Sequence, residues 1–170
     1  MRALVPLAAL AAFAFAQSAA AATVTLSPVT LSEDFQTTLQ EDYGEREGIY
    51  LQKEVTESVS RALTRAGAQL APGGDLVLDV AIIDAKPNHP TLQQLSDTPS
   101  LDMMRSISIG GAELRGVLRR SSGEVLAEID HEYNSPTLDY VHSAGQWHDA
   151  YRAINGFARE VAEAYAANAR

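Results

Sequence analysis

A short turn containing a glycine separates two segments in which apolar and polar residues alternate, and this pattern constrains the fold more than any other in the 170-residue chain. We interpret Ile107–Tyr133 as a β-hairpin that turns at Ser122-Gly123. Glycine supplies the positive φ that a two-residue hairpin loop needs. The sequence therefore predicts an antiparallel pair of strands around which the rest of the chain is organised.

A two-residue loop fixes the register of this hairpin. The register places Leu118 opposite Ala127 and Leu114 opposite His131, so that the apolar side chains of both strands share one face. A slip of one residue would turn charged side chains toward the core, so this register alone gives a buried face. The apolar phase changes at Gly110-Gly111, where we expect a bulge or a sharp bend.

The first 22 residues have the pattern of a secretory signal peptide. Arg2 provides a short positive start, residues 4–15 form an apolar run, and Ala20-Ala21-Ala22 offers small residues for cleavage. A cut after Ala16 is an alternative. The apolar run is too short to span a bilayer. We therefore expect residues 1–22 to be removed, and residues 23–170 to form a single α+β domain.

Composition limits the partners and the compartment. The formal net charge of −9 would repel phosphate groups, so we expect no nucleic-acid binding. The chain contains no cysteine, so it has neither a disulfide framework nor the residue that lipoprotein acylation requires. With no further long apolar run, the expectation is a periplasmic or secreted protein that is soluble after signal cleavage and has no transmembrane segment.

The remaining elements follow from periodicity and turn residues. Together they predict an α+β fold of order β-α-β-β-β-α, with a mostly antiparallel sheet of about four strands and two helices packed on one face. In chain order we expect a strand at Val24–Leu31, a loop at Ser32–Glu47, a helix at Ile49–Ala66, a strand at Asp75–Ala85, a long connection at 86–106, the hairpin, an irregular segment at 134–146 and a helix bearing an apolar stripe from Trp147 to Tyr165.

Three stretches resemble an uncharacterised family of bacterial outer-membrane or periplasmic lipoproteins, a domain of unknown function. They are Ile109–Leu114, the hairpin segment Ser122–Ala127 that follows Arg119, and Trp147–Ala150 at the start of the last helix. The resemblance covers roughly residues 47–165. It implies an envelope protein without catalytic residues to transfer. Unlike such lipoproteins, this chain has no cysteine to acylate.

No catalytic signature is present in the sequence. We find no Gly-x-Ser-x-Gly elbow, no phosphate-binding loop and no cysteine nucleophile. Glu128, Asp130 and Glu132 share one strand face, and the hairpin register places Arg115 opposite Asp130. We interpret these carboxylates as a solvated face rather than an acid–base pair. The prediction is therefore no catalytic residue and no cofactor, with the binding residues unknown.

The histidines leave one alternative open. His142 and His148, with Asp139 nearby, form a conceivable surface metal site, although their spacing matches no standard zinc motif. We interpret them instead as ordinary surface residues and predict no metal site. His131 is expected to be a half-buried histidine with a polar partner, and His89 lies in a proline-rich connection.

Two hypotheses of function follow. The first is a noncatalytic envelope module that binds a protein, glycan or lipid through the segments 86–106 and 134–146, or through an exposed strand edge. The second is a metal-dependent or other hydrolase that uses the 134–149 region. The sequence favours the first, because it contains two long irregular segments and no catalytic motif.

Export of the full chain in a Gram-negative host tests the signal prediction. We expect the periplasmic protein to have an intact mass that begins at Thr23, because small residues precede that position. The variant Leu10→Arg places a charge in the apolar run and should keep the chain uncleaved in the cytoplasm. A periplasmic protein that still carries Met1 would contradict the prediction.

Overall fold

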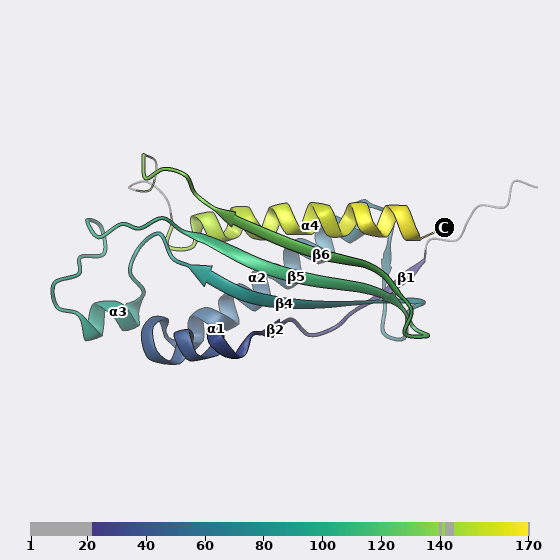
Figure 1. Ribbon diagram of the computed structural model, residues 1–170, viewed down its shortest axis with the longest axis horizontal. Coiled ribbons are helices and arrows are strands. Elements are labelled where there is room, and N and C mark those ends of the chain that lie inside the picture. Colours follow the sequence, from purple (N-terminus) through teal and green to yellow (C-terminus); the bar gives the residue numbers. More distant parts are fainter. Residues whose placement is uncertain (1–21, 140, 142–144, 170) are drawn as a thin grey trace, which may run out of the picture.

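A mixed sheet of six strands forms one layer of the structure (Figure 1). The computed structural model describes residues 22–139, 141 and 145–169. The strands are β1 Thr23–Leu26, β2 Thr30–Leu31, β3 Gln69–Leu70, β4 Leu76–Lys86, β5 Gly111–Arg120 and β6 Val125–Asn134. Their order is β3-β1-β4-β5-β6, and β2 also pairs with β4.

The sheet confirms the α+β class but corrects the predicted four-stranded, mostly antiparallel arrangement. β4 pairs in parallel with β1 and β2, and β1 pairs in parallel with β3. Only the β4–β5 and β5–β6 pairs are antiparallel. The chain passes through a long helix between β1 and β4, and such a crossover makes the two strands parallel. Strands of two residues are too short to produce a visible alternation, so β2 and β3 were not predicted.

β4, the strand expected at Asp75–Ala85, is central in the sheet. It is bordered by β1 and β2 on one side and by β5 on the other. Leu76, Leu78, Val80 and Ile82 alternate along it and are buried on one face. The intervening residues are partly exposed. The sheet therefore has one face in the core and one face toward solvent.

On the open face, Asp79 of β4 is hydrogen-bonded to β5 on one side and to the residue that follows β1 on the other. Arg119 donates from Nε to Asp79 Oδ2 at 2.8 Å, and Ser27 Oγ donates to Asp79 Oδ1 at 2.6 Å. Burial raises the pKa of Asp79, but these hydrogen bonds and the Arg119 charge lower it by more, so the pKa lies below its usual value. The carboxylate therefore remains ionised at neutral pH and keeps both partners.

The hairpin register is confirmed along most of its length, including Leu118 opposite Ala127 and Leu114 opposite His131. The turn itself differs from the predicted two-residue loop. Gly123 N–H donates to the Arg120 carbonyl at 2.9 Å, and Gly123 has φ 97°. This is a three-residue loop closed by a glycine in the left-handed region.

A second irregularity compensates for the longer loop. The pairing shifts by one residue between Leu118 and Arg119, so that Arg119 lies opposite Val125. The longer loop and this shift move the register in opposite directions, so their effects cancel. The predicted register is therefore correct beyond the turn. The first arm begins later than predicted, because β5 starts at Gly111 and Ile107 lies before it in irregular chain.

Helices account for much of the remaining chain. They are α1 Glu33–Thr38, the π-helix η1 Leu39–Tyr43, α2 Glu45–Arg65, α3 Leu92–Asp97 and α4 His148–Asn168. The predicted loop at Ser32–Glu47 is therefore wrong. Ser32 caps α1 by accepting a hydrogen bond from Phe35 N at 3.1 Å, and Phe35 is buried. A serine followed by two acidic residues is a helix-start signal that the loop assignment overlooked.

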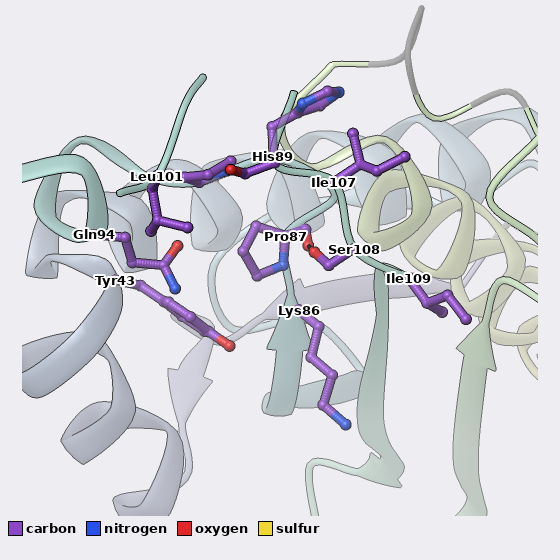
Figure 2. Close-up of a pocket in the computed structure, with 11 residues that line it drawn as sticks. Tyr43, Lys86, Pro87, His89, Gln94, Leu101, Ile107, Ser108 and Ile109 are labelled. Carbon is purple, nitrogen blue, oxygen red and sulfur yellow. Dashed lines mark hydrogen bonds between the residues drawn. The ribbon is translucent and has the colours of Figure 1, made fainter. Parts of the chain in front are cut away.

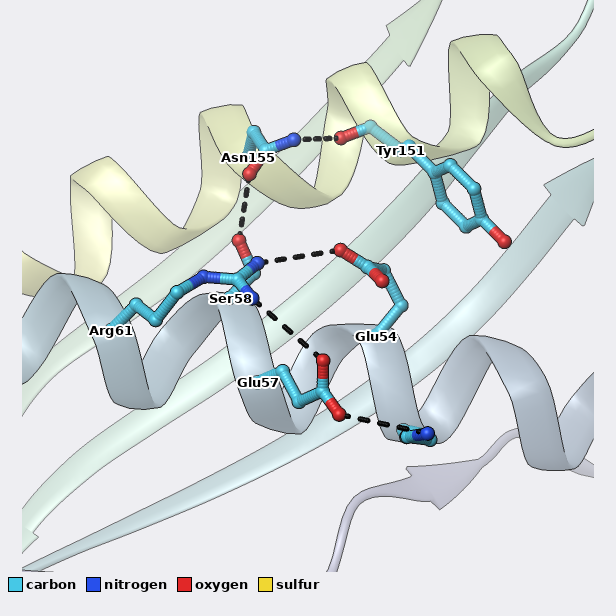
Figure 3. A network of polar contacts seen from close by, with 7 residues as sticks. Glu54, Glu57, Ser58, Arg61, Tyr151 and Asn155 are labelled. Atoms are coloured by element: carbon cyan, nitrogen blue, oxygen red, sulfur yellow. Dashed lines mark hydrogen bonds and ion pairs between the residues drawn. The ribbon is translucent and has the colours of Figure 1, made fainter. Parts of the chain in front are cut away.

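The two long helices pack against each other, and α4 packs on β5 and β6 (Figure 1). Ser58 of α2 donates to Asn155 Oδ1 of α4 at 2.8 Å, while Arg61 on α2 pairs with Glu54 and Glu57 at the helix surface (Figure 3). Within the described residues, no helix combines the length and apolarity needed to cross a membrane.

Glycine allows α4 to approach the sheet closely. A Cβ on Gly116 of β5 would lie 2.9 Å from Cζ of Phe157, whose side chain is fully buried in α4. On the same helix, a Cβ on Gly156 would lie 2.6 Å from His131 Nε2 of β6. The absence of these two methyl groups sets the distance between helix and sheet.

Substitution at this contact tests the packing. Gly116→Ala should lower the free energy of unfolding by about 1–3 kcal/mol, because the added methyl group overpacks against Phe157. Urea denaturation followed by the fluorescence of Trp147 measures the change. Gly145→Ala is the matched control, since a Cβ there has no neighbour within 4 Å. Equal stability of the two variants would contradict the packing argument.

Candidate binding site at the end of the sheet

The connection from β4 to β5 projects beyond the sheet and contains α3 (Figure 1). The predicted loop at 86–106 is thus partly helical. Thr91 caps α3 by accepting from Gln94 N, and the Gln94 side chain accepts in return from Thr91 N. This reciprocal capping box was readable in the sequence as a threonine followed three residues later by glutamine. It holds the connection in one shape.

A buried amide and a buried carboxylate fasten the start of the connection to the start of α4. Asn88 Nδ2 donates to Asp149 Oδ2 at 2.5 Å, and Asp149 N donates to Asn88 Oδ1 at 2.9 Å. Both side chains are completely buried. The carboxylate lies in the first turn of α4, where the helix dipole stabilises negative charge.

Backbone bonds complete this junction. Asn88 N donates to the Gln146 carbonyl at 2.6 Å, and Ser108 N donates to the Asn88 carbonyl at 2.9 Å. A Cβ on Gly110 would lie 2.6 Å from Asn88 Oδ1, so the chain passes this amide only as glycine. Asn88 therefore joins both ends of the connection and the beginning of α4.

A cavity of about 320 Å³ lies beside this junction, between the connection and η1 (Figure 2). In Figure 2, Tyr43, Gln94 and Leu101 lie on one side of it and Pro87 and Ser108 on the other. Its walls are mainly apolar, with a few polar groups, as in ligand pockets generally. The lining residues are Tyr43, Lys86, Pro87, His89, Pro90, Gln94, Leu101, Ser106, Ile107, Ser108 and Ile109.

Tyr43 and Gln94 both line the cavity, and each carries a side-chain donor, the phenol hydroxyl and the amide nitrogen. The buried Nδ1 of His89, which also lines the cavity, has no hydrogen-bond partner in the described part of the chain. Burial, and then the nearby charges of Asp84 and Asp42, raise the pKa of Tyr43. The phenol therefore stays protonated and able to donate over the physiological pH range. Lys86 adds an ammonium group that pairs with Asp84 at 3.7 Å.

Tyr43 is also held from the other side. Its ring lies edge-on to Trp147, with centroids 5.9 Å apart, and Trp147 Nε1 donates to Glu47 Oε2 at 2.7 Å. A second cavity, of about 460 Å³, shares Tyr43 and extends over the start of α2. The tyrosine thus forms the wall between two cavities.

The outer surface of the same connection exposes large apolar side chains. We call these four residues the apolar rim: Leu92 is 67% exposed, Met103 50%, Met104 67% and Ile109 44%. Ile109 also lines the cavity. Large exposed apolar side chains, where they gather, mark contact sites for other molecules. The sequence reasoning selected this connection from its length, but it identified neither the cavity nor the rim.

The structure describes two of the three residues of the alternative metal site. Asp139 is exposed and His148 is half-buried at the start of α4, whereas His142 lies outside the described residues. The part of the chain that the structure describes contains no group of three His, Asp or Glu residues placed to hold a metal ion. The alternative metal site therefore stays a prediction. In the sequence, Ser143 followed three residues later by Gln146 has the pattern of a capping box for the last helix. Residues 143 and 144 lie outside the described residues, and the N-cap of α4 is Trp147.

The other two histidines have partners. His131 Nδ1 lies 2.9 Å from Glu160 Oε1, in agreement with the expected half-buried histidine that has a polar partner. His89 is buried, and its Nε2 donates to the Val141 carbonyl at 2.8 Å, since a carbonyl can only accept. The predicted ion pair across the hairpin is confirmed, with Arg115 Nε 2.6 Å from Asp130 Oδ1.

No family model matches the chain, and no curated protein is similar to it. Three solved structures are similar to it over most of the chain. A dodecameric PelC variant from Paraburkholderia phytofirmans is 12% identical with a TM-score of 0.47, and the match covers 88% of this chain and 90% of that one. Protein XCC0632 from Xanthomonas campestris, described as DUF330, has the same identity and TM-score over 88% and 86%.

The third, the hypothetical protein CT253 from Chlamydia trachomatis, is 16% identical with a TM-score of 0.49 over 86% and 99%. The expected relation to an uncharacterised family stays a prediction. The lipoprotein character that the resemblance implied stays a prediction.

A double-mutant cycle tests the junction. Asn88→Ala removes the amide that donates to Asp149 and should lower the free energy of unfolding by about 1–3 kcal/mol. Gly110→Ala should also destabilise the protein, because its methyl group meets Asn88. The double variant should be more stable than the sum of the two effects predicts, by about 0.5–3 kcal/mol. Strict additivity in urea denaturation would contradict the proposed contact.

Proposed function

We propose that this chain is a noncatalytic binding module of the bacterial envelope, and that it binds a protein partner at the cavity and the apolar rim. The observation that carries the proposal is the placement of four exposed apolar side chains on a connection that also encloses a cavity of about 320 Å³. A partner side chain that fills such a cavity, surrounded by apolar contacts, is the usual centre of a protein interface.

The energetics favour a partner with an apolar surface. Complete burial of one Leu or Met side chain stabilises a complex by about 1.5–3 kcal/mol, so the apolar rim supplies a large driving force. The two methionines of the rim adapt to different surfaces because their side chains are unbranched and flexible. A glycan would instead need many directed polar groups, whereas the cavity walls are mainly apolar.

The donors in the cavity indicate what the partner presents there. Tyr43 and Gln94 both offer a hydrogen, and Lys86, whose ammonium group pairs with Asp84, lines the same cavity. A carbonyl oxygen, such as that of a peptide backbone, accepts hydrogen bonds from such donors. The partner segment would therefore place an apolar side chain in the cavity and a backbone carbonyl near these donors.

The envelope location rests on the sequence. Residues 1–22 have the signal-peptide pattern, and the absence of cysteine removes the route to acylation. The partner would accordingly be another envelope protein that the module meets after export. Nucleic acid is an unsuitable partner for a chain of net charge −9.

Site-specific photocrosslinking tests the proposal. A photoreactive residue at Met104 should crosslink to one envelope protein in intact cells, whereas the same residue at Val125, which is 52% exposed at the hairpin end, should give no such product. Leu92→Asp should reduce the Met104 product at least fivefold, and Val125→Asp should leave it unchanged. Equal crosslinking from both positions, or none from Met104, would overturn the proposal.

Metal analysis of the purified mature protein tests the hydrolase alternative. Stoichiometric metal that is lost in His142→Ala and His148→Ala variants, with the fold intact by circular dichroism, would favour an enzyme using Asp139, His142 and His148 over a binding module.

A further inference from the structure

β6 is the last strand of the sheet, and its outer edge has no partner strand among the described residues. The strand is ten residues long, which is long for an edge strand of a globular protein. Unpaired backbone N–H and C=O groups on such an edge can pair with an added strand. The edge is therefore a second surface, distinct from the cavity and the apolar rim.

The hydrogen-bond pattern identifies the residues whose backbone faces outward. Just beyond β6, Ser135 N donates to the Gly110 carbonyl of the neighbouring chain segment at 3.0 Å. In an antiparallel pair, residues with inward and outward backbone groups alternate. The odd-numbered residues from 127 to 135 thus pair with β5, and Glu128, Asp130 and Glu132 direct their N–H and C=O groups away from the sheet.

The same three residues carry exposed carboxylates on the open face of the sheet. Asp130 pairs with Arg115, while Glu113 lies directly opposite Glu132 and adds a further negative charge. Like charges directly opposite each other destabilise a strand pair. The edge therefore carries an excess of negative charge at regular two-residue spacing.

This charge excludes a second copy of the chain as the added strand. An antiparallel pair of two β6 strands centred on Asp130 would place Asp130 opposite its own copy and Glu128 opposite Glu132. The three central facing pairs on the open side would each be two carboxylates, which repel each other. A strand with cations at the same spacing would instead form a favourable pair at each position.

We propose that the outer edge of β6 binds an extended, lysine- or arginine-rich segment of another protein by strand addition. Cationic side chains at every second position of the segment pair with Glu128, Asp130 and Glu132. The intervening residues face the helix side, where the half-buried ring of Tyr133 lies under the guanidinium of Arg152 at 5.0 Å. Small uncharged side chains are suited to those positions.

A synthetic peptide tests the proposal. The probe is a ten-residue peptide of alternating lysine and threonine with blocked ends, titrated into the mature protein and followed by NMR of backbone amides. We expect saturable binding that weakens with salt. The outward amides of β6 should gain protection from hydrogen exchange. An analogue with the same charge, but with N-methyl groups on the backbone nitrogens that face β6, should bind at least tenfold more weakly.

Two variants separate the backbone from the charge. Glu128→Pro removes an outward N–H but no bond to β5, because proline is tolerated at such edge positions. Glu128→Gln removes the charge alone. We expect the proline variant to weaken binding at least tenfold, and by more than the glutamine variant does.

Equal binding of the two peptides would overturn strand addition and leave simple ion pairing. Undetectable binding of the unmodified peptide would overturn the proposal entirely and leave the carboxylates as a guard against self-association. If Glu128→Pro fails to fold, the comparison of the two peptides on the wild-type protein still decides.

Discussion

Burial of one face of β4 is the constraint on which the other elements depend. Its buried leucine, valine and isoleucine side chains meet the core from a strand that is paired on both sides. The parallel partners on one side need a helical crossover, which α2 supplies, and the antiparallel partner on the other side belongs to the hairpin. Because α4 covers β5 and β6, both long helices contribute to the same core.

The junction of Asn88 and Asp149 fastens the connection between β4 and β5 to the start of α4. A completely buried carboxylate is costly unless it is hydrogen-bonded, and the amide of Asn88 satisfies part of that requirement while its backbone holds the connection. The cavity exists because the connection is fixed in this way. Binding surfaces in loops are commonly built by such a rigid support.

The sequence was informative where many residues share one period. The hairpin faces, the central strand and the apolar stripe of α4 each involve several side chains in a repeated pattern, so errors at single positions do not matter. α1 and η1 were missed because each buries a single side chain, Phe35 and Leu39, and because the cap at Ser32 was overlooked. The contact of Asn88 with Asp149 joins residues that are 61 positions apart, and no local sequence pattern predicts such a pair.

The hairpin tip is a place where the chain tolerates inserted residues. Its three-residue loop and the shift between Leu118 and Arg119 displace the register in opposite directions, so the buried faces of β5 and β6 do not depend on the loop alone. Insertions at Ser121-Ser122 can be absorbed where the chain already departs from regular pairing. The tip is therefore a suitable attachment point for an added peptide or fluorophore, because it lies at the opposite end of the sheet from the connection that contains α3 (Figure 1).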